Sequence, residues 1–295
     1  MRNLFSLKRQ VCVFLVSVSI VMGTYIYHFM YLPGLEAKNN EIGLKKILEE
    51  TANYCERVKG MALFYVCKEK ITEKEFFYSG TTFARSATER EQRPFQLAST
   101  KEKKLLYDYQ LIKKAGELKE QRILLEEDGK KMYQEDAELD KIKYVSENLV
   151  FGPVGFLSQS WQGYFNYEIV GEDSVSGVKT LIIRSSPKRE MEENYNFGKI
   201  WIDKDNFQIL KIEWEPVSIK HYEEGQIPTF LGEFKQRVIW TVDYGVEKNG
   251  VRFPSCQMVK EVFINEKGYK ILKRELSCDY VDYKFFTVET EVKYD

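Results

Sequence analysis

Few side chains in this 295-residue chain are of the types that catalyse reactions or bind metal ions. There are two histidines: His28 lies in a hydrophobic N-terminal run, and His221 lies in a charged segment beside Tyr222. One imidazole does not make a metal cluster, and a catalytic triad needs a base within hydrogen-bonding distance of a nucleophile. We therefore interpret His221 as part of a surface loop and predict no metal site.

The carboxylates and glycines form no recognised catalytic pattern. Residues 203–206 (Asp-Lys-Asp-Asn) resemble a calcium loop only faintly, because the glycine and the downstream glutamate are missing, so a hairpin turn is expected. Residues 152–155 lack the lysine of a phosphate loop. Glu213 and Glu215 alternate along a strand, where a solvated face is expected and a glycosidase-type pair is an unsupported alternative. We predict a protein that is not an enzyme and needs no cofactor.

Four cysteines follow the N-terminal run and leave two interpretations open. An even number of cysteines in an exported chain suggests disulfide bridges. Cys256 and Cys278 flank a hairpin loop at residues 266–268, and Cys55 and Cys67 lie at the end of a predicted helix and in the strand after it. The alternative is that all four are reduced and buried, where thiols pack as small hydrophobic groups.

The hairpin around residues 266–268 has a predictable register. A three-residue loop ending in glycine fits a type I turn closed by a bulge. Extending the pairing puts Cys256 opposite Cys278, Met258 opposite Leu276 and Val262 opposite Leu272, so that apolar residues meet on one face. Lys260 opposite Arg274 is the one unfavourable pair in this register.

The charge and the aromatic content indicate a β-rich protein that does not bind nucleic acid. Lys plus Arg number 44 against 45 for Asp plus Glu, and the two signs are interspersed. Nucleic-acid-binding proteins usually show a basic patch instead. With 19 Tyr and 19 Phe, aromatic residues make up 14% of the chain, and aromatic side chains favour strands.

The N-terminus predicts export. Arg2, Lys8 and Arg9 precede an uncharged run over residues 11–31, and this order of charges directs the rest of the chain out of the cytoplasm. The run is long enough for an uncleaved membrane anchor, although its most apolar part is only as long as the core of a cleavable signal. Cys12 lies too early for a lipoprotein cleavage site. We expect residues 1–34 to be a signal or transmembrane anchor. The protein is then expected either to be anchored in the inner membrane facing the periplasm or, if the leader is cleaved, to be free in the periplasm.

Residues 35–295 are expected to form one α+β domain that is mainly β. Apolar residues between Leu44 and Val58 recur at helical spacing, which predicts one amphipathic helix. After Gly60 the chain reads as about ten or eleven strands, with hairpin turns at residues 114–117, 204–206 and 249–250. Because such turns join neighbouring strands, we predict a curved, half-open antiparallel sheet covered by the helix.

A central segment interrupts these strands. Residues 129–160 combine a charged stretch with Phe-Gly-Pro-Val-Gly-Phe-Leu at 151–157, and a short helix is expected over about 154–163. We predict that this segment is a lid over the sheet. The side chains expected to contact a ligand are Phe151, Phe156, Leu157, Trp161 and Tyr164. The alternative is that the same residues simply fill the core.

The order of helix, strands, lid and paired strands resembles the LolA/LolB-like lipoprotein-carrier superfamily. Residues 179–188, 198–204 and 209–213 look like that family's strand, Pro-Lys loop and paired strands, and 151–157 would occupy its lid position. The whole chain, including residues 282–292, also looks like uncharacterised bacterial exported proteins of similar length. The resemblance implies a half-open sheet closed by helices over an apolar cavity. The family's carriers have a cleavable signal and its outer-membrane receptor is lipidated, and this chain shows neither feature clearly.

Two hypotheses about function follow. In the first, the protein binds or carries a hydrophobic ligand at the cell envelope, such as an acyl chain, a lipid or a lipoprotein, because apolar walls favour the removal of acyl chains from water. In the second, it is a membrane-anchored structural module with a filled core that meets another envelope protein. Fold alone does not decide between them, because function depends on sites.

Overall fold

The computed structural model describes residues 43–79, 96–114, 117–140, 142–144, 155, 157–188, 196–219, 225–229 and 232–286. The chain divides into two compact units, Met1–Ile47 and Leu48–Asp295. The predicted signal or anchor, residues 1–34, lies outside the described residues. Within those described residues, no helix has the length and the apolar character needed to span a bilayer.

The predicted N-terminal helix is confirmed. It covers residues 43–61 and is followed by the 3-10 turn η1 (Ala62–Phe64). In the second unit its buried positions are spaced by three or four residues, so they share one face: Thr51, Tyr54, Cys55 and Val58. The Tyr54 hydroxyl accepts a hydrogen bond from the Arg252 backbone N–H at 3.1 Å, which ties this face to the C-terminal half of the chain.

Strands make up most of the remainder. In the first half they are β1 (Tyr65–Ser79), β2 (Gln96–Lys114), β3 (Glu117–Glu127), β4 (Lys130–Gln134), β5 (Phe165–Val175) and β6 (Val178–Pro187). In the second half they are β7 (Gly198–Asp203), β8 (Ile209–Trp214), β9 (Gln226–Thr229), β10 (Gly232–Asp243), β11 (Val246–Lys248), β12 (Val251–Phe253), β13 (Cys256–Asn265) and β14 (Lys270–Phe285). Two short helices are α3 (Gln159–Gln162) and the 3-10 turn η2 (Pro216–Ser218).

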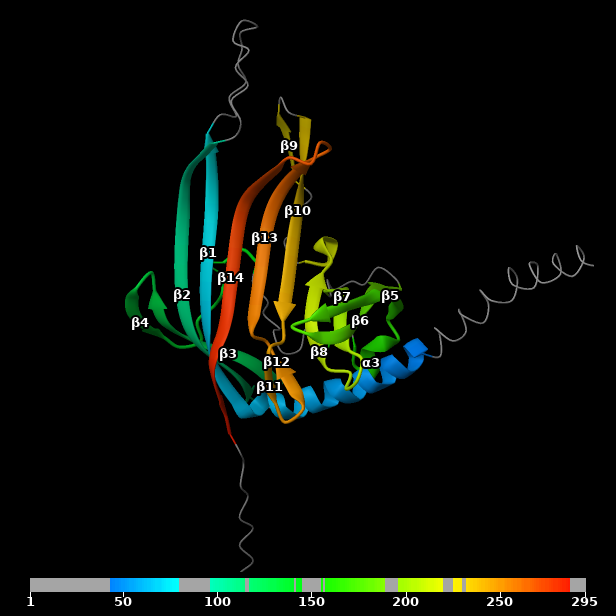
Figure 1. The fold of residues 1–295 in the computed structure, drawn as a ribbon. Coiled ribbons are helices and arrows are strands. Elements are labelled where there is room, and N and C mark those ends of the chain that lie inside the picture. Colours follow the sequence, from blue (N-terminus) through cyan, green and yellow to red (C-terminus); the bar gives the residue numbers. More distant parts are fainter. Residues whose placement is uncertain are drawn as a thin grey trace, which may run out of the picture. The chain divides into compact units, whose positions relative to one another are not determined.

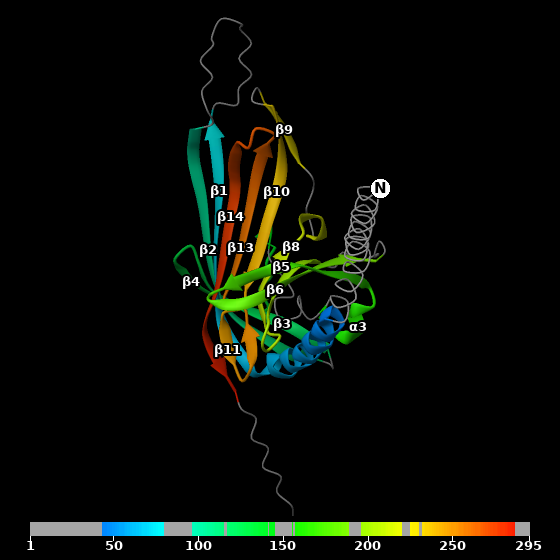
Figure 2. The same cartoon turned by 45° about the vertical axis from the view of Figure 1, so that its right-hand side comes forward.

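One large antiparallel sheet organises these strands. Its order is β4-β3-β2-β1-β14-β13-β10-β8-β7-β6-β5, with β9 also paired to β10, while β11 and β12 form a separate hairpin. Figures 1 and 2 show the long strands β1, β2, β14, β13 and β10 side by side, with β5 and β6 running across them at a steep angle. The sheet is open, so the predicted fold class is confirmed. The strong change in strand direction is the accumulated twist of a large sheet.

The predicted hairpins are confirmed where the structure describes them. Asn249 and Gly250 have φ of 52° and 72°, as a type I′ turn requires, and Glu247 faces Arg252 across it. Gly268 has φ of 81° in the three-residue loop before β14. At the β7–β8 turn, the Asp205 N–H donates to the Asp203 carboxylate at 2.8 Å, so these acidic residues form a turn as expected.

The register between β13 and β14 differs from the prediction by one residue. Val262 faces Leu272 as predicted, but Glu261 faces Arg274, so Lys273 is an extra residue in β14. This β-bulge shifts every later pair and removes the unfavourable contact, because Lys260 now faces Glu275 and forms an ion pair at 3.2 Å. The bulge therefore gives Lys260 and Glu261 of β13 each an oppositely charged partner on β14.

The bulge also separates the two cysteines that the predicted register had paired. Cys256 faces Asp279, and Cys278 faces Gln257. Neighbouring residues of a strand point to opposite faces, so the two sulfurs lie on opposite sides of the sheet. All four described cysteines are free, and no Cys55–Cys67 bridge forms. The interpretation as reduced, packed thiols is the one the structure supports. Burial raises the pKa of Cys55 and Cys67 to about 12.

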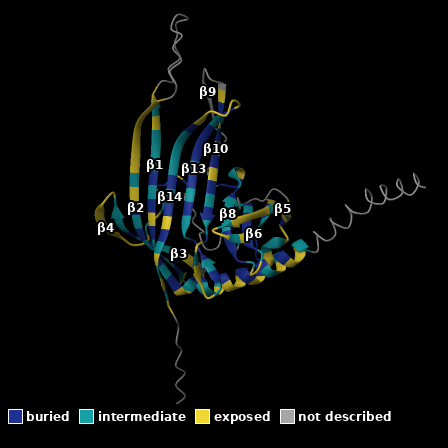
Figure 3. Cartoon of the chain, viewed as in Figure 1, coloured by how far each residue is buried: buried dark blue, intermediate teal, exposed yellow. Residues whose placement is uncertain are grey.

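The long strands have one buried face and one exposed face. Along β1, Cys67, Glu69, Ile71 and Glu73 are buried and alternate with partly or fully exposed residues (Figure 3). The buried positions of β2, β14, β13 and β10 lie opposite these residues in the register. We call this side of the sheet the inner face and the other side the outer face.

Candidate functional site on the inner face of the sheet

A buried ion-pair cluster occupies one end of the inner face. Arg122 on β3 donates to both carboxylate oxygens of Glu69 on β1, at 2.6 and 3.3 Å, and Glu69 is fully buried. The Tyr280 hydroxyl donates to Glu69 at 3.2 Å, and Glu120 accepts from Arg122 at 3.1 Å. Burial opposes the charge of Arg122, but the two carboxylates outweigh it and hold the pKa of Arg122 well above its usual range. We call this the Arg122 cluster.

A second cluster lies further along the same strands. Arg274 on β14 donates to Glu73 at 2.6 Å and to Glu75 at 3.2 Å, and it lies 3.5 Å from Glu261 on β13. Gln236 on β10 donates to Glu261 at 2.6 Å. Burial again opposes the positive charge, and the carboxylates raise the pKa of Arg274. This group is called the Arg274 cluster.

Between the two clusters the inner face is mostly apolar. The residues there belong to adjacent strands in register and are at most 3% exposed: Ile71, Leu276, Cys278, Val259, Gln257 and Trp240. We call them the central belt. Two charged clusters with an apolar floor between them give this face a mixed character, whereas the sequence predicted an apolar one throughout.

The central belt contains two buried polar side chains that lack partners. The amide nitrogen and oxygen of Gln257 form no hydrogen bond with the described residues, and the indole Nε1 of Trp240 forms none either. Gln257 is fully buried and Trp240 is 3% exposed. Burying such groups without partners is unfavourable, and the Arg274 Nε and the Tyr65 hydroxyl are also buried without a hydrogen bond to the described residues.

A short irregular stretch covers the Arg274 cluster. Ile142 and Tyr144 are buried although no strand or helix contains them. Lys143 forms an ion pair with Glu261 at 3.4 Å, and Gln236 donates to the Tyr144 hydroxyl at 3.5 Å. These two long polar contacts connect the stretch to β13 and β10. We call residues 142–144 the cover stretch.

Some of the predicted lid residues lie within the described residues and others do not. Phe151 and Phe156 lie outside it. Leu157 is fully buried, Trp161 is half-buried, and Tyr164 is 57% exposed with its ring centroid 5.5 Å from that of Trp161. The predicted short helix is present as α3.

Side-chain contacts attach α3 to its surroundings. Its Gln162 amide donates to the carbonyls of Leu48 at 2.7 Å and Leu157 at 2.8 Å. The ammonium of Lys188, just after β6, donates to the Gly163 carbonyl at 2.9 Å. The position of Trp161 is therefore fixed by hydrogen bonds to the N-terminal helix and to β6. Contact of the predicted lid residues with a ligand stays a prediction.

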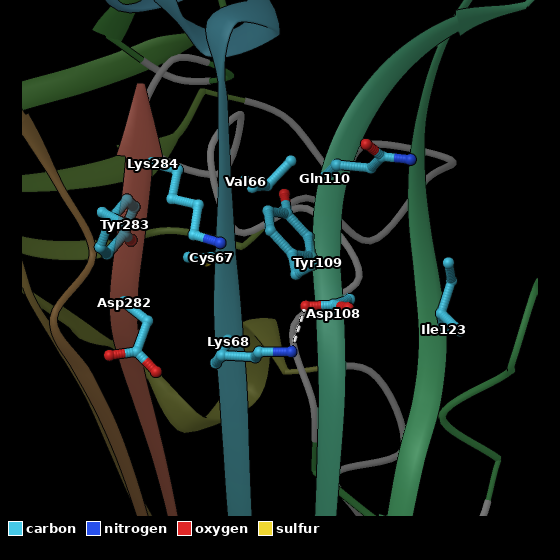
Figure 4. Close-up of a pocket in the computed structure, with 10 residues that line it drawn as sticks. All are labelled: Val66, Cys67, Lys68, Asp108, Tyr109, Gln110, Ile123, Asp282, Tyr283 and Lys284. Atoms are coloured by element: carbon cyan, nitrogen blue, oxygen red, sulfur yellow. Dashed lines mark ion pairs between the residues drawn. The ribbon is translucent and has the colours of Figure 1, made fainter. Parts of the chain in front are cut away.

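A pocket of about 590 Å³ lies along β1 and β2, and its lining includes Cys67 of the inner face and Lys68 of the outer face (Figure 4). Residues of β1, β2, β3 and β14 line it, and Lys68 and Asp108 meet across it in an ion pair at 2.7 Å. Asp282 and Lys284 add one charge of each sign. Val66, Ile123 and Tyr109 add apolar surface beside these charges, so the lining is mixed and has no net charge.

The remaining candidates from the sequence have structural roles or are undescribed. Glu213 pairs with Lys199 of the neighbouring strand at 3.1 Å. His221 lies outside the described residues. Within the described part of the chain, no three His, Cys, Asp or Glu side chains lie together as a metal site would require.

Sequence reasoning missed the two clusters and the polar members of the central belt. A signal for part of them exists in the sequence. Glu69 and Glu73 alternate with period two beside Cys67 and Ile71, which places carboxylates on the same face as apolar residues. For Gln257 the signal is the same alternation, because Gln257 recurs with Val259 and Glu261 along β13, but the alternation does not show which face of the strand is buried.

The chain is similar to one protein family over part of its length and to several solved structures over most of it. A family model described as an uncharacterized protein matches residues 156–223. No curated protein matches the chain. The similar solved structures include a DUF1329 family protein from Desulfovibrio piger, with 11% identity, 83% of this chain and 94% of that chain covered, and a TM-score of 0.38.

Two further solved structures are similar to the chain over most of its length. A LolA superfamily protein from Nitrosomonas europaea has 12% identity and a TM-score of 0.33, with 83% of this chain and 94% of that chain covered. An outer membrane lipoprotein-sorting protein domain from Vibrio parahaemolyticus has 10% identity and a TM-score of 0.37, with 84% and 95% covered.

Proposed function

We propose that this protein binds a hydrophobic ligand, the acyl chain of a lipid or lipoprotein, against the inner face of its sheet. The observation that carries this proposal is the central belt: an apolar floor bounded by two ion-pair clusters. Burial of apolar ligand surface is worth about 25 cal/mol per Å². The flanking charges make the floor the favourable place for an acyl chain, because charged groups resist desolvation by hydrocarbon.

The way in which the inner face is covered also supports a ligand that enters and leaves. The cover stretch contacts the sheet through Lys143–Glu261 at 3.4 Å and Gln236–Tyr144 at 3.5 Å. Ion pairs that are partly exposed contribute about 1 kcal/mol or less. Displacing the cover therefore breaks few polar contacts, but it also exposes the buried side chains of Ile142 and Tyr144, a cost that the apolar surface of a bound ligand would offset.

We also propose that the protein works at the cell envelope and catalyses no reaction. Export by the N-terminal run would place the sheet on the outer side of a bacterial inner membrane, where it meets lipids and lipoproteins. We propose a carrier or binding role without catalysis, because the buried carboxylates of the inner face are engaged by arginine and tyrosine side chains.

The test is uptake of a fluorescent fatty-acid probe by the purified chain from residue 35 onward, together with mass spectrometry of lipid that co-purifies with it. We expect saturable uptake and bound lipid. Trp161→Ser should weaken uptake while leaving the circular dichroism spectrum unchanged, because Trp161 is a half-buried member of the predicted lid. Tyr133→Ser on β4 is the matched control, because Tyr133 is 70% exposed and lies on the edge strand β4. Wild-type protein with neither lipid nor uptake would refute the carrier role.

The alternative is an anchored interaction module. It is favoured by the end strands of the sheet, since β5 lies at one edge with Ile169 and Val170 both more than a third exposed. An edge strand is able to pair with an extended segment of another envelope protein. The uptake experiment separates the two, because a module with a filled inner face takes up no probe.

A further inference from the structure

Gln257 lies in the most enclosed row of the inner face without a hydrogen-bond partner. Its neighbours in the register are Cys278 on β14 and Val242 on β10. Valine has no polar side-chain atom and a thiol is a weak donor, so neither satisfies an amide. Trp240 is the diagonal neighbour, because it lies two residues from Val242 on the same face.

The two side chains together present a defined set of hydrogen-bonding atoms. Gln257 offers an amide NH₂ and a carbonyl oxygen, and Trp240 offers an indole N–H. Within the part of the chain that the structure describes, all of these atoms are buried and unpartnered. A buried unsatisfied group costs about 1–3 kcal/mol. Leucine at position 257 would avoid this cost and would match the apolar residues around it.

We infer that Gln257 and Trp240 are the polar contact of the acyl-binding site and bind the carbonyl of an ester- or amide-linked acyl chain. This inference rests on the proposed function and adds the ligand class to it. The NH₂ of Gln257 and the N–H of Trp240 donate to the carbonyl oxygen, and the Gln257 oxygen accepts from an amide N–H where the ligand has one. The apolar remainder of the central belt contacts the chain itself.

The contact explains why a polar side chain lies on this floor. A free hydrocarbon would leave the amide and the indole N–H unpaired, while an acyl ester or amide satisfies them. A site built around hydrogen-bonding groups discriminates strongly against ligands that lack the matching group. The ligand class is therefore acylated molecules and not hydrocarbons in general.

The experiment compares two probes on the purified chain from residue 35 onward. Diphenylhexatriene is a hydrocarbon and reports the apolar floor, and a pyrene-labelled fatty-acyl ester reports the carbonyl contact as well. We expect Gln257→Leu to weaken ester binding about tenfold, which corresponds to about 1.4 kcal/mol, and to leave diphenylhexatriene binding unchanged or tighter. Trp240→Phe should act in the same direction, because it removes the N–H and keeps an aromatic ring.

A stability measurement accompanies the binding data. Gln257→Leu should raise the melting temperature of the ligand-free protein, because it removes an unpartnered buried amide. Gln121→Leu on β3 is the control; Gln121 accepts a hydrogen bond from Gln110 at 2.7 Å and is not among the residues that line the pocket, so its loss should leave both probes unaffected. Loss of both probes together in Gln257→Leu, or equal ester binding in Gln257→Leu and wild type, would overturn the inference.

The outcomes separate this inference from the proposed function. Wild-type protein that binds neither probe refutes the acyl-binding role itself. Wild-type protein that binds both probes, with no effect of Gln257→Leu or Trp240→Phe on the ester, refutes only the carbonyl contact. Competition by a diacylated lipopeptide against a phospholipid with the same chains then distinguishes the two sources of the acyl group, and preference for either is consistent with the contact.

Discussion

Single residues of the inner face combine burial with charge in a way that costs stability unless every group is paired. Glu69 is fully buried and is satisfied by Arg122 and Tyr280. Such a pair contributes little compared with apolar residues of the same size, but removing one partner leaves the other charge uncompensated. Arg122 therefore stabilises the fold mainly because it compensates the buried charge of Glu69.

Arg122→Met should lower the free energy of unfolding by about 3–5 kcal/mol, because it leaves the buried Glu69 carboxylate without a cation. Urea denaturation followed by fluorescence measures this change. Arg184→Met is the control: Arg184 pairs with Glu168 at 2.9 Å on an exposed surface, where such pairs contribute about 1 kcal/mol or less. Equal effects of the two substitutions would show that Glu69 is not buried as described.

Strands that are far apart in the sequence pair through tertiary contacts, which the local preferences of turn residues do not predict. The first long strand, β1, pairs with the last, β14, and not only with its neighbour β2. Arg274 of β14 donates to Glu73 and Glu75 of β1, so charge pairing accompanies this junction. At the other end of the sheet, β7 and β8 approach closely at Gly198. The Gly198 N–H donates a hydrogen bond to the Ser185 hydroxyl of β6 at 3.1 Å.

Gly198→Ala should destabilise the protein by about 2 kcal/mol or more, since overpacking in a filled core costs about 1–3 kcal/mol. A Cβ at this position would collide with the Glu213 carbonyl and come within 2.9 Å of the Trp214 Cα. Thermal unfolding followed by circular dichroism measures the effect. Gly60→Ala, in the N-terminal helix with nothing within 4 Å of its added Cβ, should instead stabilise by about 0.5–1 kcal/mol. A neutral Gly198→Ala would mean that β7 and β8 are further apart.

At the largest scale, the unit Leu48–Asp295 contains an open sheet, and separate, small elements cover parts of it. The N-terminal helix contacts the β11–β12 hairpin through Tyr54, and the cover stretch contacts β13 and β10. Enclosure by separate segments, rather than by closure of the sheet, is compatible with a protein that exchanges a hydrophobic ligand. The N-terminal run would then fix where in the cell that exchange occurs.

The full chain, expressed in a bacterium, should sediment with membranes and stay there after a high-salt wash, because an uncleaved apolar run of about 20 residues spans a bilayer. The chain from residue 35 onward, fused to a cleavable signal, should appear in the soluble periplasmic fraction. Immunoblotting of the fractions measures both. Full-length chain found soluble, with its N-terminus mapped after residue 22, would show that the leader is cleaved.

The amino-acid sequence by itself determined the elements that depend on residues a few positions apart. The helical spacing before Val58, the Asn249–Gly250 turn and the loop ending at Gly268 all follow from local backbone preferences. Tertiary structure decided the pairing of β1 with β14, the extra residue Lys273, and hence which residues share the inner face. No local signal specifies contacts between residues about 200 positions apart. A one-residue bulge reverses the face of every residue beyond it in its own strand, so the separation of Cys278 from Cys256 became visible only in the folded sheet.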